Sequence, residues 1–121
     1  MDRKKILLVD DEAAIRRMAR AVLGEEFYEI TEEGNGLDAQ ARLEKQKFDL
    51  IITDIIMPGC DGIDLAIDVR SKHPDTKIII MSGRVRSAHY FDLAEKLGAT
   101  RVVEKPFDTE AFRKVVHELL D

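Results

Sequence analysis

The sequence predicts a single α/β domain, residues 1–121, built on a doubly wound, five-stranded parallel sheet with five helices. Two observations predict this class. Short apolar runs alternate with helical patterns five times along the chain. Three of the runs are continuously apolar, which is typical of strands buried on both faces. The length suits one domain, and the hydrophobic fraction of 45% is enough for one core.

Five short segments are expected to form the strands. The second segment mixes apolar and charged residues, so it is expected at an edge of the sheet. Connections between successive parallel strands should be right-handed crossovers through the intervening helices. The expected strands are Ile6–Val9, Phe27–Thr31, Leu50–Thr53, Lys77–Met81 and Arg101–Val103.

Each strand is followed by a segment in which apolar residues recur at helical spacing, and these residues are expected to face the core. Gly24 and Gly98 stand where the first and fourth helices should end. Asp108 or Thr109 should begin the fifth. The second helix, residues 36–46, has only a weak apolar stripe. The expected core positions are Ile15, Met18, Ala19 and Val22; Leu37 and Ala41; Ile63, Ala66 and Ile67; Tyr90, Leu93, Ala94 and Leu97; and Phe112, Val115, Val116 and Leu119.

Composition excludes several classes of function. The net charge of −5 argues against direct nucleic-acid binding by this domain, because such binding draws on a basic face. The single cysteine, Cys60, rules out an intrachain disulfide and fits a cytoplasmic setting. No apolar stretch approaches the roughly 20 residues that span a bilayer, so no membrane association is expected. The apolar run after the charged first five residues is too short for a signal peptide.

Polar residues follow four of the five expected strands. Asp10 and Asp11 follow the first strand, and Asp54 follows the third. Ser82 comes directly after the fourth strand and Lys105 shortly after the fifth. Carboxyl ends of parallel strands meet at one edge of the sheet, where ligands bind in folds of this class. The five side chains are therefore expected to converge.

Three neighbouring carboxylates need a cation. Two unit charges about 4 Å apart repel by about 4 kcal/mol at an effective dielectric constant of about 20. A hard divalent cation removes this penalty, and Mg²⁺ is typically held by one or two carboxylates together with waters and phosphate oxygens. The cluster therefore predicts Mg²⁺-assisted phosphate chemistry.

Four short motifs, each after a strand and in this order, resemble those of the receiver domain of two-component response regulators. They are the acidic pair in Val9–Glu12, the segment Asp54–Gly62 that runs through Met-Pro to Asp-Gly, the hydroxyl site Met81–Gly83, and the Lys-Pro-Phe segment Lys105–Phe107. The resemblance covers essentially the whole chain. It implies a flavodoxin-like sheet of strand order 2-1-3-4-5. A chemotaxis-type single-domain regulator and the N-terminal receiver of a larger protein both fit it.

The resemblance also implies the chemistry. Asp54 would accept a phosphoryl group from a histidine kinase or a phosphotransfer protein, as the nucleophile of a covalent step. Ser82 and Lys105 would bind the phosphoryl oxygens. The chain would catalyse only its own phosphorylation and dephosphorylation and would not be an enzyme in the usual sense.

The metal site is implied in the same way. Asp11 and Asp54 would ligate Mg²⁺ together with the backbone carbonyl of Ile56, and Asp10 would act through a metal-bound water. The metal would bridge phosphate oxygens and neutralise their charge.

The expected output is a change of conformation. Phosphorylation would bias a two-state surface formed by the fourth helix, the fifth strand and the fifth helix, which would bind a downstream protein. The chain would be a monomer or a phosphorylation-dependent dimer. The expected contact residues are Arg86, Phe91, Arg101, Arg113 and His117.

Three positions depart from the family pattern or tune it. Val102 occupies a position where the family often has an aromatic residue, so the signal should reach the fourth helix differently. Ile56 and Arg84 lie at the positions that set phosphate lifetime in the family. The apolar Ile56 should hinder an attacking water, which predicts slow self-dephosphorylation that Ile56→Asn would accelerate.

Other readings stay open at this point. The chain could be a phosphorylation-independent scaffold, a Mg²⁺-dependent phosphohydrolase or a flavin-binding module of the same architecture. The phosphohydrolase of the haloacid-dehalogenase type needs Asp-x-Asp after its first strand, whereas this chain has Asp10-Asp11-Glu12. Taken singly, the residues also have ordinary roles: an acidic turn for Asp10 and Asp11, a loop cap for Asp54, a turn serine for Ser82 and a surface lysine for Lys105. Cys60 and the histidines, His73, His89 and His117, are interpreted as having no chemical role, with the histidines on the surface.

Overall fold

The computed structural model of the chain describes residues 3–55, 57, 62–83, 92, 96, 99–105 and 108–120. Its sheet has five strands in the order β2-β1-β3-β4-β5, all parallel, as predicted. The strands are β1 (Lys4–Val9), β2 (Tyr28–Glu33), β3 (Leu50–Asp54), β4 (Lys77–Ser82) and β5 (Arg101–Glu104).

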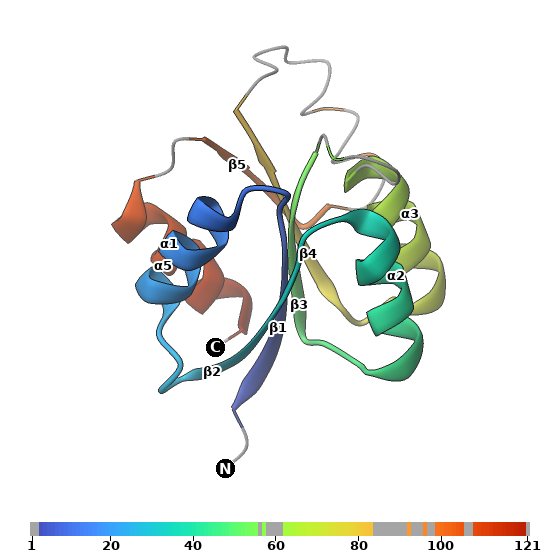
Figure 1. The fold of residues 1–121 in the computed structure, drawn as a ribbon, viewed down its shortest axis with the longest axis horizontal. Coiled ribbons are helices and arrows are strands. Elements are labelled where there is room, and N and C mark those ends of the chain that lie inside the picture. Colours follow the sequence, from blue (N-terminus) through green and yellow to red (C-terminus); the bar gives the residue numbers. More distant parts are fainter. Residues whose placement is uncertain are drawn as a thin grey trace.

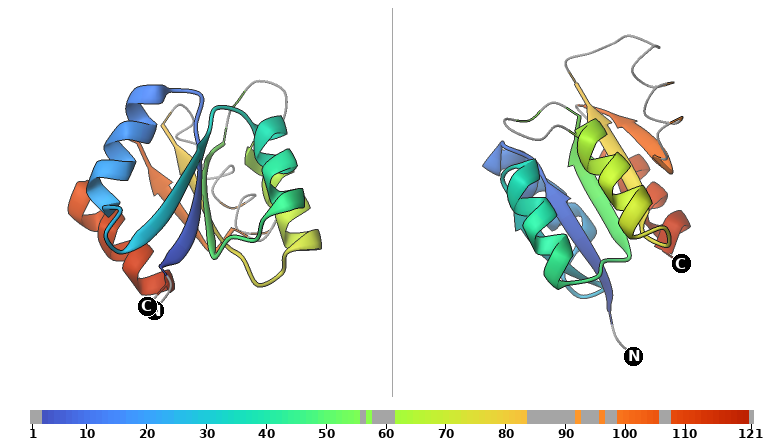
Figure 2. Two further views of the ribbon diagram at one scale, coloured as in Figure 1. Left: turned by 60° about the horizontal axis from the view of Figure 1, so that its bottom comes forward. Right: turned by 90° about the vertical axis from the view of Figure 1, so that its right-hand side faces the viewer.

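Helices cover both faces of the sheet (Figures 1 and 2). One face carries α1 (Ala13–Leu23) and α5 (Thr109–Leu120), and the other carries α2 (Gly36–Lys45) and α3 (Gly62–Lys72). The fourth predicted helix, with its apolar set from Tyr90 to Leu97, lies outside the described residues except for two isolated positions, Asp92 and Lys96. Within the described ranges, no helix has the length and hydrophobicity that crossing a bilayer requires.

The central strands are buried on both sides, which confirms the reading of their continuous apolar runs. Side chains alternate between the two faces of a strand. In β1, Leu7 and Val9 pack with the core under α2 and α3, whereas Ile6 and Leu8 pack with the core under α1 and α5. All four side chains are fully buried.

The edge position predicted for the second strand is confirmed, but its limits were wrong. The strand is shifted toward the C-terminus and ends at Glu33, while Phe27 lies outside it and is 60% exposed. The two final glutamates look like loop residues in the sequence. They extend the strand because they pair with Leu8 and Val9 of β1. Their charges are met by arginines of the neighbouring helices: Glu32 pairs with Arg16 and Arg20 of α1, and Glu33 with Arg42 of α2.

Several expected core positions are exposed. Met18, Leu37, Ala41 and Ile67 point away from the core. In α2 the buried face is formed by Gly36, Ala39 and Leu43 instead, and in α3 by Gly62, Leu65, Ala66 and Val69. The small residues Gly36, Ala39, Gly62 and Ala66 lie on the helix faces that pack closely against the sheet. The larger apolar side chains of Leu37 and Ile67 lie beside these faces and remain exposed.

Candidate functional site

Strand register brings the predicted residues to one edge of the sheet. Val9 of β1 lies opposite Thr53 of β3, so the next residues, Asp10 and Asp54, become neighbours. On the other side of β3, Asp54 lies opposite Met81 of β4. Ser82 in turn lies opposite Glu104 of β5, directly before Lys105. The predicted convergence on the carboxyl edge is therefore confirmed for these four residues.

The centre of the site is an ion-paired lysine. The Nζ atom of Lys105 lies 2.7 Å from Oδ2 of Asp10 and 3.2 Å from Oδ2 of Asp54. The side chain of Asp10 is fully buried, and those of Asp54 and Lys105 are 13% and 12% exposed. One ammonium thus joins two carboxylates that arrive from separate strands. The three aspartates were predicted to cluster, but the role of Lys105 in holding two of them together was not foreseen.

Backbone donors fix the other oxygen of each carboxylate. Oδ1 of Asp10 accepts a hydrogen bond from the amide of Glu12 at 2.9 Å, and Oδ1 of Asp54 accepts one from the amide of Ile55 at 2.8 Å. Arg16 also donates a hydrogen bond to the backbone carbonyl of Asp10. With both oxygens engaged, each carboxylate is held in one orientation before any ligand arrives.

The electrostatics of the site follow from this partial burial. Burial raises the pKa of the Asp54 carboxyl, the charge of Lys105 opposes this rise, and the charge of Asp10 adds to it; the net direction is upward. For Lys105, burial lowers the pKa of the ammonium, but the hydrogen bond and charge of Asp10, together with Asp54, outweigh burial and leave the pKa raised. Lys105 is therefore a fixed cation.

Two glycines allow the close packing that the site needs. A Cβ on Gly83 would lie 2.8 Å from Cβ of Lys105, so the bare backbone after β4 lets the lysine pass into the site. A Cβ on Gly62 would lie 2.1 Å from the backbone oxygen of Asp54, so the first turn of α3 can lie directly against the end of β3. Both approaches require glycine because real Cβ atoms essentially never come this close to other heavy atoms.

Ser82 is the last residue of β4, one residue beyond the predicted end of the strand at Met81, and it is almost fully buried. Its backbone carbonyl accepts a hydrogen bond from the amide of Lys105 at 2.8 Å. The hydroxyl residue and the lysine are thus tied together through the backbone on the side of the site formed by β4 and β5.

The acidic end of β1 offers oxygen atoms to a cation. Carboxylate oxygens of Asp10, Asp11 and Glu12 all lie within 4.8 Å of one another, with Asp10 buried and the other two exposed. Oxygen-only donors beside open solvent suit Mg²⁺, which keeps several of its waters. The sequence did not single out Glu12, which the structure places in this cluster and whose side chain does not cap α1. Ile56, the predicted carbonyl ligand, lies outside the described residues.

The structure describes some of the residues that were expected to contact a downstream protein and not others. Arg101 and Arg113 are exposed, whereas Arg86 and Phe91 fall outside the described ranges, as do Arg84 and Cys60. Val102 is partly buried against the core under α2 and α3.

His117, interpreted from the sequence as a surface residue without a chemical role, is partly exposed but has ring contacts that the sequence did not show. His117 is half-buried; its Nδ1 lies 3.1 Å from the hydroxyl of Tyr28, and its ring meets the ring of Phe27 edge-on. These contacts were not visible in the sequence because 89 residues separate Tyr28 from His117.

Comparisons with known proteins point to one family. A family model described as the response regulator receiver domain matches residues 6–117. The transcriptional regulatory protein ResD of Bacillus subtilis is 41% identical over 103 residues, which are 85% of this chain and 42% of ResD. The response regulator receiver protein CpdR of Brucella abortus is 36% identical over 116 residues, 96% of this chain and 93% of CpdR. The structure of the Vibrio cholerae chemotaxis protein CheY4 matches with a TM-score of 0.88 at 31% identity, covering 98% of this chain and all of that one.

Proposed function

This chain belongs to the family of response regulator receiver domains, the phosphorylation-activated switches of two-component systems, and we propose that Asp54 is its phosphoryl acceptor. The observation that carries the proposal is the contact of Lys105 with the carboxylates of both Asp10 and Asp54. Of the two carboxylates beside this cation, Asp10 is fully buried, whereas Asp54 is partly exposed to solvent and can therefore be reached by a phosphoryl donor.

In the proposed reaction, an oxygen of Asp54 attacks the phosphorus of a phosphohistidine. An oxygen–phosphorus bond forms, the phosphorus–nitrogen bond breaks, and the imidazole of the donor leaves with the electron pair and takes up a proton. Lys105 stabilises the negative charge on the phosphoryl oxygens. Ser82, at the end of β4, donates a hydrogen bond to the same oxygens. Hydrolysis later frees Asp54, so the chain acts on itself alone.

Receiver domains of this family bind Mg²⁺ at an acidic pocket, and the carboxylates of Asp10, Asp11 and Glu12 provide one here. We propose that Asp11 and Asp54, with the carbonyl of Ile56, would hold the ion, and that Asp10 would act through a water. When bound, the ion supplies a divalent charge that neutralises phosphoryl oxygens. Asp10 keeps its second role as the partner of Lys105.

Receiver domains exchange signals with histidine kinases and downstream effectors. We propose a histidine kinase or phosphotransfer protein as the donor, in a cytoplasmic setting. We propose the surface around β5 and α5 as the output face, acting as a monomer or a phosphorylation-dependent dimer without direct contact to nucleic acid or membrane. The exposed Arg101 and Arg113 belong to this surface.

The test is the intact mass of the protein after incubation with acetyl phosphate and Mg²⁺. The wild type should gain one phosphoryl group, and the gain should vanish in Asp54→Asn and in the presence of EDTA. Asp75→Asn is the matched control, because Asp75 is an exposed aspartate on the loop before β4, at the opposite end of the sheet, and should leave the gain intact. A wild type without any gain would favour a phosphorylation-independent scaffold. Sustained turnover of a phosphate ester would favour a phosphohydrolase.

A further inference from the structure

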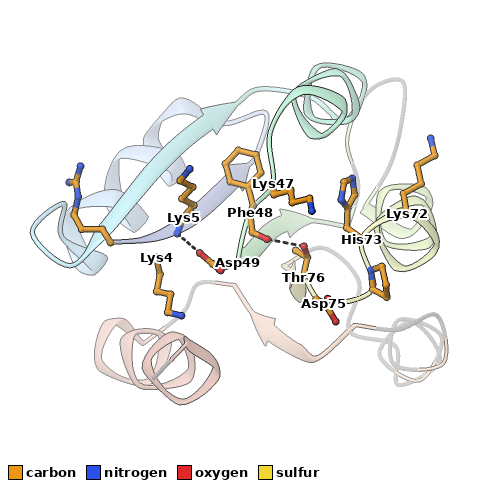
Figure 3. A pocket seen from close by; sticks show the side chains of 11 residues that line it. Lys4, Lys5, Lys47, Phe48, Asp49, Lys72, His73, Asp75 and Thr76 are labelled. Atoms are coloured by element: carbon orange, nitrogen blue, oxygen red, sulfur yellow. Dashed lines mark hydrogen bonds between the residues drawn. The ribbon is translucent and has the colours of Figure 1, made fainter. Parts of the chain in front are cut away.

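A hollow lies at the amino edge of the sheet, at the opposite end of the strands from Asp54 (Figure 3). Its volume is about 540 Å³. Three segments line it: the start of β1, the loop before β3, and the end of α3 with the loop before β4. None of its residues belongs to the phosphorylation site.

The hollow is basic in an acidic protein. Five cationic side chains line it against two carboxylates, although the whole chain has a net charge of −5. The cations come from all three segments, which are far apart in the sequence. They are Arg3, Lys4, Lys5, Lys47 and Lys72. In Figure 3, Lys4 and Lys5 point to opposite sides of the start of β1, and Lys72 lies at the far side of the hollow.

Most of these charges are not neutralised. Among the described residues, no carboxylate lies within ion-pair distance of the ammonium groups of Lys4, Lys5 or Lys47. Arg3 donates a hydrogen bond to the backbone carbonyl of Glu25 at 2.6 Å, and it too has no carboxylate counterion among the described residues. Lys72 alone has one, Asp68, at 3.0 Å.

The floor of the hollow is held by hydrogen bonds that also occupy one of its acids. Oδ2 of Asp49 accepts a hydrogen bond from the backbone amide of Lys5 at 2.8 Å (Figure 3). The hydroxyl of Thr76 donates to the backbone carbonyl of Phe48 at 2.8 Å, which ties the loop before β4 to the loop before β3. These hydrogen bonds fix the backbone segments that carry the flexible lysines. They also leave Asp49 hydrogen-bonded to a backbone amide rather than paired with a lysine side chain.

We propose that this hollow binds a small polyphosphate anion, meaning a ligand that carries two or more linked phosphate groups. Its volume falls within the range of about 300–1,000 Å³ that is typical of small-molecule sites. Lysine ammonium groups are compact charges on flexible stems and bind phosphate as point charges. A compact anion with several charges suits the cations of the first two segments, Arg3, Lys4, Lys5 and Lys47, because none of them has a carboxylate partner among the described residues. An extended acidic peptide needs a row of cations along one line.

The proposal is tested by titrating ¹⁵N-labelled protein with tripolyphosphate in EDTA, so that no metal links the anion to the acidic edge. Saturable binding should shift the amide signals of Lys5, Asp49 and Thr76 and leave those of Asp10 and Ile55 in place. The affinity should fall steeply with added salt. A parallel titration with ATP assigns the source of the phosphate: binding at least as tight indicates a nucleotide, and weaker binding indicates free polyphosphate.

The matched variants carry the same change of net charge. Lys4→Gln/Lys47→Gln removes two cations from the hollow and should weaken tripolyphosphate binding by at least tenfold. Lys96→Gln/Lys114→Gln removes two exposed lysines elsewhere and should leave it unchanged. Equal weakening in the two variants would overturn the proposal, because it would show attraction by overall charge only. Shifts centred on Asp10, the absence of saturation, or tighter binding of a hexaglutamate peptide than of tripolyphosphate would overturn it as well.

Discussion

The two ends of the same sheet handle charge in opposite ways. At the carboxyl edge, Lys105 is mostly buried and pairs with two carboxylates, of which Asp10 is fully buried. At the amino edge, Lys4, Lys5 and Lys47 are exposed, and no carboxylate among the described residues pairs with them. Removing the partner of a buried charge lowers stability strongly, because the remaining charge is left without water and without a counterion. Removing the partner of an exposed charge changes stability little, because water solvates the remaining charge. The first edge therefore suits a covalent switch with fixed geometry, and the second suits reversible attraction of an anion.

The largest effect is expected from Lys105→Met, which keeps the length of the side chain and removes its charge. The variant leaves Asp10 buried without a cation, and breaking a buried ion pair in this way costs about 3 kcal/mol of unfolding free energy. Urea denaturation in EDTA measures the loss. Mg²⁺ should restore part of it, because a second cation then compensates the carboxylates.

The control for this prediction is Lys114→Gln, an exposed lysine of α5 whose loss should change stability by less than about 0.5 kcal/mol. A loss below about 1 kcal/mol in Lys105→Met would show that the pair does not hold the carboxyl edge together.

A second effect at the carboxyl edge is expected from Gly62→Ala. The new Cβ would lie 2.1 Å from the backbone oxygen of Asp54, so α3 must move away from β3. Overpacking of this kind costs about 2 kcal/mol. In Gly34→Ala the nearest atom is a side-chain nitrogen of Arg16 at 3.6 Å, which is an ordinary contact. Thermal unfolding of the two variants should therefore separate them, and equal melting temperatures would refute the close approach.

A smaller effect with a defined pH dependence is expected from Asp54→Asn. Burial raises the pKa of Asp54 above its ordinary value of 3.8, so the folded state binds this proton more tightly than the unfolded state does. Ionised Asp54 therefore lowers stability at neutral pH, and the wild type recovers this stability as the pH falls through the folded pKa toward the unfolded one. Asp54→Asn lacks this dependence. In EDTA it should be slightly more stable than the wild type at pH 7, and the difference should shrink toward pH 4; a constant difference would contradict the raised pKa.

The smallest effect is expected from Lys47→Gln at the amino edge. Among the described residues no carboxylate pairs with Lys47, so the unfolding free energy should change by no more than about 0.5 kcal/mol. Phosphorylation by acetyl phosphate should proceed at the rate of the wild type. A loss of stability comparable to that of Lys105→Met would show that Lys47 has a partner, which contradicts the contrast drawn between the two edges.

Much of the fold follows from local sequence, because continuous apolar runs and helical spacing depend on near neighbours. The strand order came from family resemblance. The limits of β2 could not be predicted, since Glu32 and Glu33 pair with β1 and meet arginines of α1 and α2 that are distant in the sequence. Leu37 of α2 was expected in the core because it is large and apolar, but it is exposed. The helix faces the core through the smaller residues Gly36 and Ala39, which allow it to approach the sheet closely.

The residues of the candidate site were predictable because each stands at the end of a strand. Their pairing was not, because Lys105 lies 95 residues from Asp10 and the sequence does not say which carboxylate it contacts more closely. The basic hollow was missed for the same reason. Its lysines come from three distant segments, and each one alone is an ordinary exposed lysine.

The most direct measurement identifies the acceptor residue chemically. Borohydride reduction of an acyl phosphate converts the aspartate that carries it to homoserine, which peptide mass spectrometry locates after treatment with acetyl phosphate and Mg²⁺. Homoserine at position 54, and at no other position, is the predicted result. Homoserine at position 10 or 11, or a phosphorylated protein without homoserine at position 54, would contradict the assignment of Asp54 as the acceptor.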